Sequence, residues 1–169
     1  VEQLSESEVV IGVLPFYHIY GMVMIMSSAL RSGASIVTMP RFDLEQFLEL
    51  LEKHGVTVAY LVPPIILALA KHPAVDNYDL TQLQSIMSGA APLPETVGRD
   101  CATRNNVVVR QGYGLTETSP VTHANPRDME IKVSSVGPTL PNTEYRIVDS
   151  TTMEDAPRGE LGEVWVRGP

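Results

Sequence analysis

Residues 107–120 read V-V-V-R-Q-G-Y-G-L-T-E-T-S-P, and they join an apolar run to a cluster of small, aromatic, hydroxyl and acidic side chains. The run Val107-Val108-Val109 has the β-branched composition of a buried strand. After it, Gly112 and Gly114 allow the backbone to approach a ligand closely, and Tyr113 offers a flat face to a base or another ring. Ligands bind at the carboxyl ends of strands in open α/β sheets, so the stretch predicts a strand that leads into a site.

Three polar side chains continue the same stretch. Thr116 and Thr118 carry hydroxyl groups suited to phosphate oxygens, and Glu117 is a hard oxygen ligand suited to Mg²⁺. The alternative is a glycine turn leading into a helix that a threonine caps, with Glu117 in its first turn. The local sequence is equally typical of a ligand site and of a capped turn.

Apolar runs alternate with helical patterns along most of the chain. The predicted strands are 9–14, 35–39, 57–62, 83–88 and 107–109, and the predicted helices are about 20–31, 43–54, 63–72 and 94–105. The clearest helix has Asp43 as its cap, Gln46 three residues later and Gly55 just past its end. This alternation predicts an α/β fold with a mostly parallel sheet flanked by helices.

The pattern changes from about Val136. Segments 144–148 and 163–167 are short alternating strands with no helix between them, joined through the turn-rich residues 155–159. We therefore predict two parts. Residues 1–134 form the α/β subdomain, and residues 135–169 form the incomplete beginning of a β-rich, barrel-like subdomain.

Composition excludes several classes of protein. The 169 residues carry a net charge of -8, which disfavours binding to nucleic acid because phosphates require clustered Lys and Arg. No apolar run approaches the roughly 20 residues that a membrane-spanning helix needs. The single cysteine, Cys101, excludes an internal disulfide and favours a reducing compartment, which makes the cytoplasm the expected location.

Two further strand ends carry unusual residues. The sequence P-F-Y-H follows the first predicted strand, and its His18 is either a polar group in an aromatic pocket or a structural histidine. Residues 88–92 follow the fourth strand with small side chains only, which suits either a backbone edge for a planar ligand or a tight turn. The other three histidines lack metal-ligand spacing. Three such stretches at one edge of a sheet favour a binding crevice.

Five segments, in this order, resemble motifs of the adenylate-forming acyl-activating (AMP-binding) enzymes. They are L-P-F-Y-H-I-Y-G-M at 14–22, S-G-A-A-P-L at 88–93, Q-G-Y-G-L-T-E-T at 111–118, S-V-G-P at 135–138 and G-E-L-G-E at 159–163. The family includes acyl- and aryl-CoA ligases, luciferases and nonribosomal adenylation domains. The wording of the first two motifs is most similar to 4-coumarate–CoA ligases and their fatty acyl-CoA ligase relatives.

The resemblance implies an acid–CoA ligase with ATP, Mg²⁺ and CoA as its cofactors and co-substrates. A small-molecule carboxylic acid would attack the α-phosphate of ATP to form acyl-AMP and pyrophosphate, and the thiol of CoA would then displace AMP. It also implies three catalytic residues, of which Thr116 binds the α-phosphate, Glu117 holds Mg²⁺ and His18 lies near the carboxylate. The implied ATP/AMP-binding residues are Gly89, Ala90, Ala91, Gln111, Gly112, Tyr113 and Thr116.

The acyl pocket and the CoA site follow from the same resemblance. The implied acyl-pocket residues are Tyr17, His18, Gly89, Ala90, Gln111 and Gly112. Arg41 takes a place where plant ligases often carry a lysine that faces CoA. The apolar segment 21–25 suits an aromatic or medium-chain acid.

The resemblance also implies segments that this sequence does not contain: a phosphate-binding loop with its lysine, a ribose-binding aspartate and a small C-terminal domain. We therefore expect the chain to be the middle of a larger domain and to be inactive in isolation. A peroxisomal location is the alternative to the cytoplasm. The alternative functions are a luciferase-like enzyme, a nonribosomal adenylation domain and a catalytically dead scaffold. Thr116 and Glu117 argue against the scaffold, because packing requires neither. No motif predicts an oligomeric state.

Overall fold

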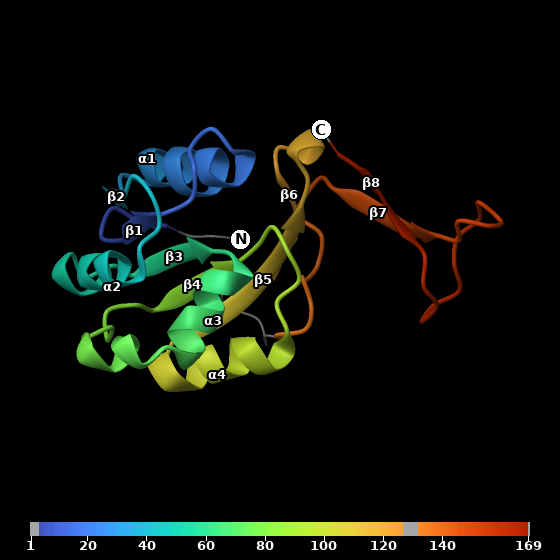
Figure 1. Ribbon diagram of the computed structural model, residues 1–169. Coiled ribbons are helices and arrows are strands. Elements are labelled where there is room, and N and C mark those ends of the chain that lie inside the picture. The colour runs from blue at the N-terminus through green and yellow to red at the C-terminus, as the bar shows by residue number, and fades with distance from the viewer. Residues whose placement is uncertain (1–3, 127–131, 169) are drawn as a thin grey trace.

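A six-stranded sheet with helices on both faces forms the body of the protein, and a two-stranded sheet extends from it (Figure 1). The computed structural model describes residues 4–126 and 132–168. The strand order is β2-β1-β3-β4-β5-β6, in which neighbours are parallel except for antiparallel β5 and β6. The strands are β1 Val9–Gly12, β2 Ser35–Thr38, β3 Val58–Leu61, β4 Ser85–Ser88, β5 Val108–Gly114 and β6 Val121–Ala124. The predicted α/β fold is confirmed.

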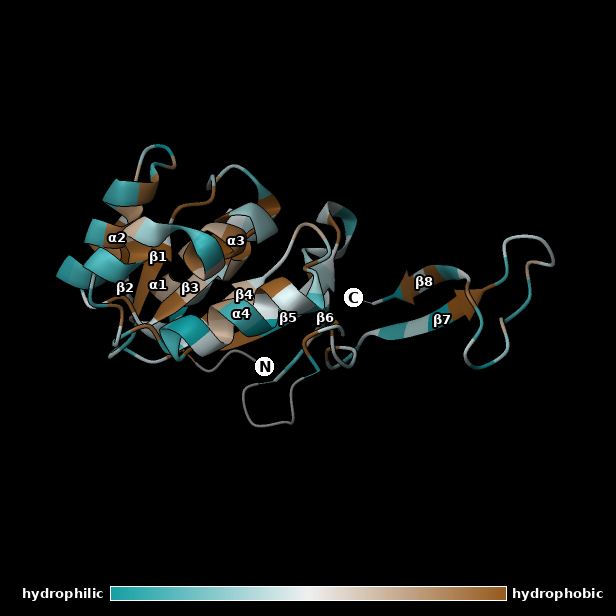
Figure 2. Cartoon of the chain, turned by 60° about the horizontal axis from the view of Figure 1, so that its bottom comes forward, coloured by the Kyte–Doolittle hydropathy of each residue, from teal (hydrophilic) through white to brown (hydrophobic). Residues whose placement is uncertain are grey.

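The helices cover the sheet in two layers. The π-helix η1 Tyr20–Ser27 and helix α1 Ser28–Ser32 lie on one face, and α2 Leu44–Lys53, α3 Pro63–Lys71 and α4 Glu95–Asn105 lie on the other (Figure 1). The short 3₁₀ helices are η2 Pro73–Asn77 and η3 Thr116–Thr118. Figure 2 shows the polar sides of α2 and α4 turned away from the sheet.

Alternate strand residues supply the two cores, as the period of two in a strand requires. Val58 and Tyr60 pack toward η1 and α1, whereas Ala59 and Leu61 pack toward α2, α3 and α4. All four are fully buried. A strand buried on both faces reads as one continuous apolar run, which is why β3 could be predicted from composition.

Helix α2 forms for the reasons that its sequence indicates. The Asp43 carboxylate accepts a hydrogen bond from the Gln46 amide at 3.0 Å, which satisfies a backbone donor that the helix itself leaves unpaired. Gly55 follows the helix with a φ of +57°, a left-handed conformation that glycine adopts readily. The buried side chains Phe47, Leu48 and Leu51 lie on its inner face. The predicted cap and end are therefore confirmed.

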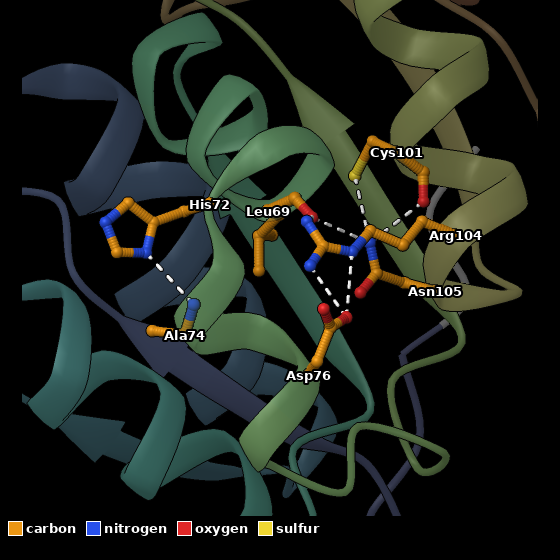
Figure 3. Close-up of polar contacts among 7 residues, drawn as sticks. All are labelled: Leu69, His72, Ala74, Asp76, Cys101, Arg104 and Asn105. Carbon is orange, nitrogen blue, oxygen red and sulfur yellow. Dashed lines mark hydrogen bonds and ion pairs between the residues drawn. The ribbon is translucent and has the colours of Figure 1, made fainter.

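Helices α3 and α4 are joined by polar contacts at their ends (Figure 3). The Asn105 side-chain amide donates to the carbonyl oxygens of Cys101 at 3.0 Å and Leu69 at 3.2 Å. Arg104 donates to the Asp76 carboxylate at 2.7 Å. Burial raises the pKa of the Cys101 thiol to about 11, so this residue is a packing residue in its protonated form.

The prediction that the fifth strand ends at residue 109 is wrong. Strand β5 continues through Gly114, because β6 pairs with its second half and supplies the backbone partners that a longer strand needs. Strand β6 was not predicted from the sequence. The buried Arg110 guanidinium links β4 to the residue that follows β6, since it donates to Ser85 Oγ at 2.8 Å and to the Asn125 carbonyl at 2.9 Å.

The predicted helix 20–31 begins as a π-helix. Its buried residues Tyr20 and Ile25 are five positions apart, a spacing that a π turn brings to one face. The Ser27 and Ser28 hydroxyls donate to carbonyl oxygens five residues earlier, which matches the wider turn.

The two strands predicted after residue 136 are confirmed as β7 Glu144–Val148 and β8 Glu163–Arg167. They pair antiparallel in a hairpin that extends from the body beyond β6 (Figure 1). Tyr145 and Trp165 are partly exposed on it. The boundary between residues 134 and 135 stays a prediction. Within residues 4–126 and 132–168, no helix has the length and apolar character that crossing a membrane requires.

Candidate active site

A cavity of about 320 Å³ opens at the carboxyl ends of β4 and β5. Seven of the predicted site residues line it: His18, Gly89, Ala90, Gly112, Tyr113, Thr116 and Glu117. Its apolar lining comes mainly from Ile19, Tyr20, Met24, Met87, Val121 and Ala124. Each of the three strand-end stretches therefore contributes at least one residue to this cavity.

The wall after β4 depends on close contact between Tyr20 and Gly89. The Tyr20 hydroxyl donates to the Met87 carbonyl at 2.8 Å, which holds its ring against the chain at this strand end. A Cβ added to Gly89 would lie 2.9 Å from Cζ of that ring, so only glycine fits. Ala90 follows with a φ of +69°, a conformation that a non-glycine residue rarely adopts. The backbone here is held in an uncommon shape at the edge of the cavity.

His18 is exposed at the cavity, and its tautomer follows from one hydrogen bond. Its Nδ1 accepts the backbone N–H of Tyr20 at 3.2 Å, so a neutral ring carries its proton on Nε2. The Nε2–H is then available to donate to an oxygen of a bound ligand.

The two threonines after β5 have different positions. Thr118 Oγ1 accepts the Leu115 amide at 3.0 Å and bonds the Pro120 carbonyl, so Thr118 secures the loop. Thr116 lines the cavity with an exposed side chain. Glu117 also lines it, and its carboxylate forms no hydrogen bond or ion pair with any other residue that the structure describes.

Two predicted residues lie at a different hollow. Tyr17, which is 88% exposed, and Arg41 line a broad hollow of about 800 Å³ at the carboxyl ends of β1 and β2. Phe16 and Phe42 border the same hollow. The structure therefore places Tyr17 beside the predicted CoA residue, whereas His18, its neighbour in sequence, lines the smaller cavity.

Gln111 and Ala91 do not line the 320 Å³ cavity. Gln111 is only 6% exposed, and its side-chain amide bonds both the amide (2.9 Å) and the carbonyl (3.2 Å) of Leu93. It thereby ties β5 to the loop that follows β4. Ala91 is exposed in that loop.

Sequence reasoning missed the residues behind Tyr113. His123 on β6 pairs with Tyr113, with ring centroids 6.0 Å apart, and burial lowers the pKa of His123. The alternating pattern of V-T-H-A at 121–124 was the available signal, but the segment is short and half polar.

The charge of the cavity is limited. No Lys or Arg is among the described residues that line it, and Glu117 is its one carboxylate there. Mg²⁺ is commonly held by one or two carboxylates together with the phosphates of a nucleotide, and a lone Glu117 fits that arrangement. The residues 4–126 and 132–168 contain no cluster of three or more His, Cys, Asp or Glu side chains suited to a metal.

This geometry defines the class as an α/β protein with a ligand cavity at the carboxyl ends of its strands. Residues 1–169 match the sequence model of the family described as AMP-binding enzyme, and the chain belongs to that family. The resemblance in the motifs is therefore confirmed.

Individual relatives agree with the family. The chain is 42% identical to 4-coumarate–CoA ligase 1 of Solanum tuberosum and 38% identical to a probable 4-coumarate–CoA ligase 1 of Dictyostelium discoideum, with 98% of the chain covered in both comparisons. The ATP-bound structure of MatB from Rhodopseudomonas palustris aligns over 97% of the chain with a TM-score of 0.87 and 30% identity. The chain covers 31%, 30% and 32% of these three proteins, which is about a third of their length.

Proposed function

We propose that this chain is part of an ATP-dependent acid–CoA ligase. A carboxylate oxygen attacks the α-phosphorus of ATP, pyrophosphate leaves, and the thiol of CoA then attacks the acyl carbon and releases AMP. The observation that carries the proposal is the single cavity lined by His18, Tyr113, Thr116 and Glu117. The similarity to 4-coumarate–CoA ligases over nearly the whole chain supports it.

The nucleotide fits the wall formed by β5 and the loop after β4. The Tyr113 ring offers a stacking face, while the backbone of Gly89 and Ala90 provides an edge free of large side chains. The Thr116 hydroxyl donates to an α-phosphate oxygen. Glu117 would hold a Mg²⁺ ion, which would neutralise negative charge on the leaving pyrophosphate. Positioning and charge stabilisation of this kind supply most of the catalysis in phosphoryl chemistry.

The acid occupies the apolar part of the cavity. His18 Nε2–H donates to the carboxylate and orients it toward the α-phosphate, and Met24, Met87 and Val121 contact the rest of the molecule. These apolar side chains suit an aromatic or medium-chain acid.

CoA approaches from the neighbouring hollow at the ends of β1 and β2. Arg41 offers a guanidinium to a phosphate of CoA, and Tyr17 offers an exposed ring beside it. The cytoplasm is the compartment we propose, since the lone Cys101 suits a reducing environment.

The test is a panel of carboxylic acids on the full-length polypeptide that contains this chain, with pyrophosphate release measured with and without CoA. We expect an aryl or medium-chain acid to stimulate release, and Thr116→Ala to reduce kcat/KM about 100-fold or more. The isolated 169-residue chain should release pyrophosphate no faster than its own Thr116→Ala variant. A folded full-length protein that no acid stimulates would favour the scaffold, and transfer of the acyl group to a carrier protein but not to CoA would favour a nonribosomal adenylation domain.

A further inference from the structure

The residues behind Tyr113 form a connected set that the proposed chemistry does not use. Tyr113 pairs with His123 across the antiparallel β5–β6 ladder, and the register shifts between Tyr113 and Gly114. Such a β-bulge re-aims a side chain at the end of a strand. The cavity wall at Tyr113 is therefore a site where local backbone geometry sets the direction of a ring.

Hydrogen bonds from β6 hold the peptide of Tyr113. The Thr122 hydroxyl donates to the Tyr113 carbonyl at 3.3 Å and lies 2.9 Å from His123 Nδ1. A hydroxyl has one proton to donate, so His123 Nδ1 must be the donor in the second bond. The resulting relay runs from the imidazole N–H through the hydroxyl to the carbonyl.

Ring contacts hold the side chain as well. His123 is 6% exposed and makes contact with two tyrosines, Tyr113 at a centroid distance of 6.0 Å and Tyr145 of β7 at 4.9 Å. The interplanar angles are 58° and 76°, within the tilted and edge-to-face geometries that aromatic pairs favour. Burial lowers the pKa of His123, which favours the neutral form of the ring at pH 7.

We propose that His123 is a positioning residue that fixes the Tyr113 ring as the stacking wall for the purine of ATP. It acts through Tyr113, by the Thr122 relay and by direct ring contact, and Tyr145 of the β7–β8 hairpin also contacts the His123 ring. This inference rests on the proposed function, because it deepens the role of the same cavity. It predicts that His123 affects recognition of the base and leaves recognition of the phosphates unchanged.

The experiment uses the full-length polypeptide with 3-fluorotyrosine placed at position 113. Its ¹⁹F resonance reports the ring environment without nucleotide, and titration calorimetry gives the Kd for Mg·ATP and for inorganic tripolyphosphate. The variants are His123→Ala, which removes ring and donor, and His123→Asn, which retains a donor near the position of Nδ1. His54→Ala, an exposed histidine at the end of α2, is the matched control.

We expect His123→Ala to shift and broaden the ¹⁹F resonance and to weaken Mg·ATP binding about fivefold, with tripolyphosphate binding within about twofold of wild type. His123→Asn should recover part of the loss, and His54→Ala should change neither reading. An unchanged resonance and unchanged Mg·ATP affinity in His123→Ala would overturn the proposal, as would an equal loss for tripolyphosphate. If His123→Ala fails to fold, a His123→Asn protein with both readings at wild-type values excludes a role for the ring.

Binding of Mg·ATP to the wild type and to Tyr113→Ala tests the proposed function separately from the role of His123. If wild type binds no Mg·ATP, or if Tyr113→Ala leaves that affinity unchanged, Tyr113 is not a nucleotide wall. The ¹⁹F readings still decide in that case whether His123 positions Tyr113.

Discussion

Gly114 is a single residue whose packing constraint could not be predicted from the sequence motif that contains it. The sequence suggested that a glycine here lets the backbone approach a ligand closely. The structure shows a second reason why the position needs glycine. A Cβ at Gly114 would overlap the Pro120 carbonyl group, 2.6 Å from its carbon atom. The glycine is therefore required for the return of the chain from β5 into β6.

Substitution of Gly114 by alanine should lower the free energy of unfolding by about 2 kcal/mol, because the Pro120 backbone must move to make room. Urea denaturation followed by circular dichroism measures the change. Gly168→Ala is the control, since the nearest atom to its Cβ lies at 3.6 Å, and we expect a change within about 0.5 kcal/mol. Equal stability of the two variants would show that the β5–β6 connection adjusts freely.

The residue types at the candidate site could be predicted from the sequence. Which of these residues line the cavity and which bond neighbouring segments could not. Thr116 and Thr118 look alike in the sequence, yet only the fold reveals that Thr118 bonds its own loop. Gln111 is likewise a predicted wall residue, and only the fold reveals that its side-chain amide bonds Leu93. Such assignments depend on contacts between segments that no local pattern records.

At the scale of elements, predictability followed the strength of local signals. Helix α2 has its cap, its apolar spacing and its terminal glycine in the sequence, and all three were found. Strand β6 has only the short alternating pattern of residues 121–124 in the sequence, and its pairing with β5 maintains it. The π-helix η1 was predicted only as a helix, since buried residues five apart do not fit a 3.6-residue period.

We expect the junction of α3 and α4 to depend more on Asn105, which Figure 3 shows, than on the ion pair between Lys71 and Asp100. Asn105→Ala should cost about 1–2 kcal/mol, because it removes partners from the carbonyl oxygens of Leu69 and Cys101 in a partly buried place. Lys71→Ala is the comparison: Lys71 pairs with Asp100, but their side chains are 60% and 45% exposed, so the expected loss is below about 0.5 kcal/mol. Guanidinium unfolding of both variants gives the ranking, and a larger loss for Lys71→Ala would contradict it.

At the scale of the whole molecule, the lining of the proposed nucleotide site is short of positive charge. The cavity has backbone edges, a stacking ring, a hydroxyl and a carboxylate, but no cation among the described lining residues. A triphosphate carries several negative charges, so a site that binds it tightly needs positive charge from Mg²⁺ and from groups outside this lining. The chain matches about a third of its relatives' length, and this charge deficit is consistent with the proposed role as one portion of a ligase.

The single cysteine offers a test of how the whole sheet opens. Cys101 is fully buried between α4 and the sheet, and burial raises the pKa of its thiol to about 11, so a disulfide reagent meets neither an accessible sulfur nor a thiolate at pH 8. The reagent can react only when the core opens, and we expect labelling of the native chain to be at least about 100-fold slower than that of an exposed thiol. The double variant Cys101→Ala/Arg158→Cys, with its thiol in the exposed loop between β7 and β8, supplies that reference rate. If Cys101 opens only with global unfolding, its labelling rate rises with urea as steeply as the unfolding equilibrium does. Labelling within tenfold of the reference in the absence of urea would instead mean that α4 separates from the sheet while the rest of the molecule stays folded.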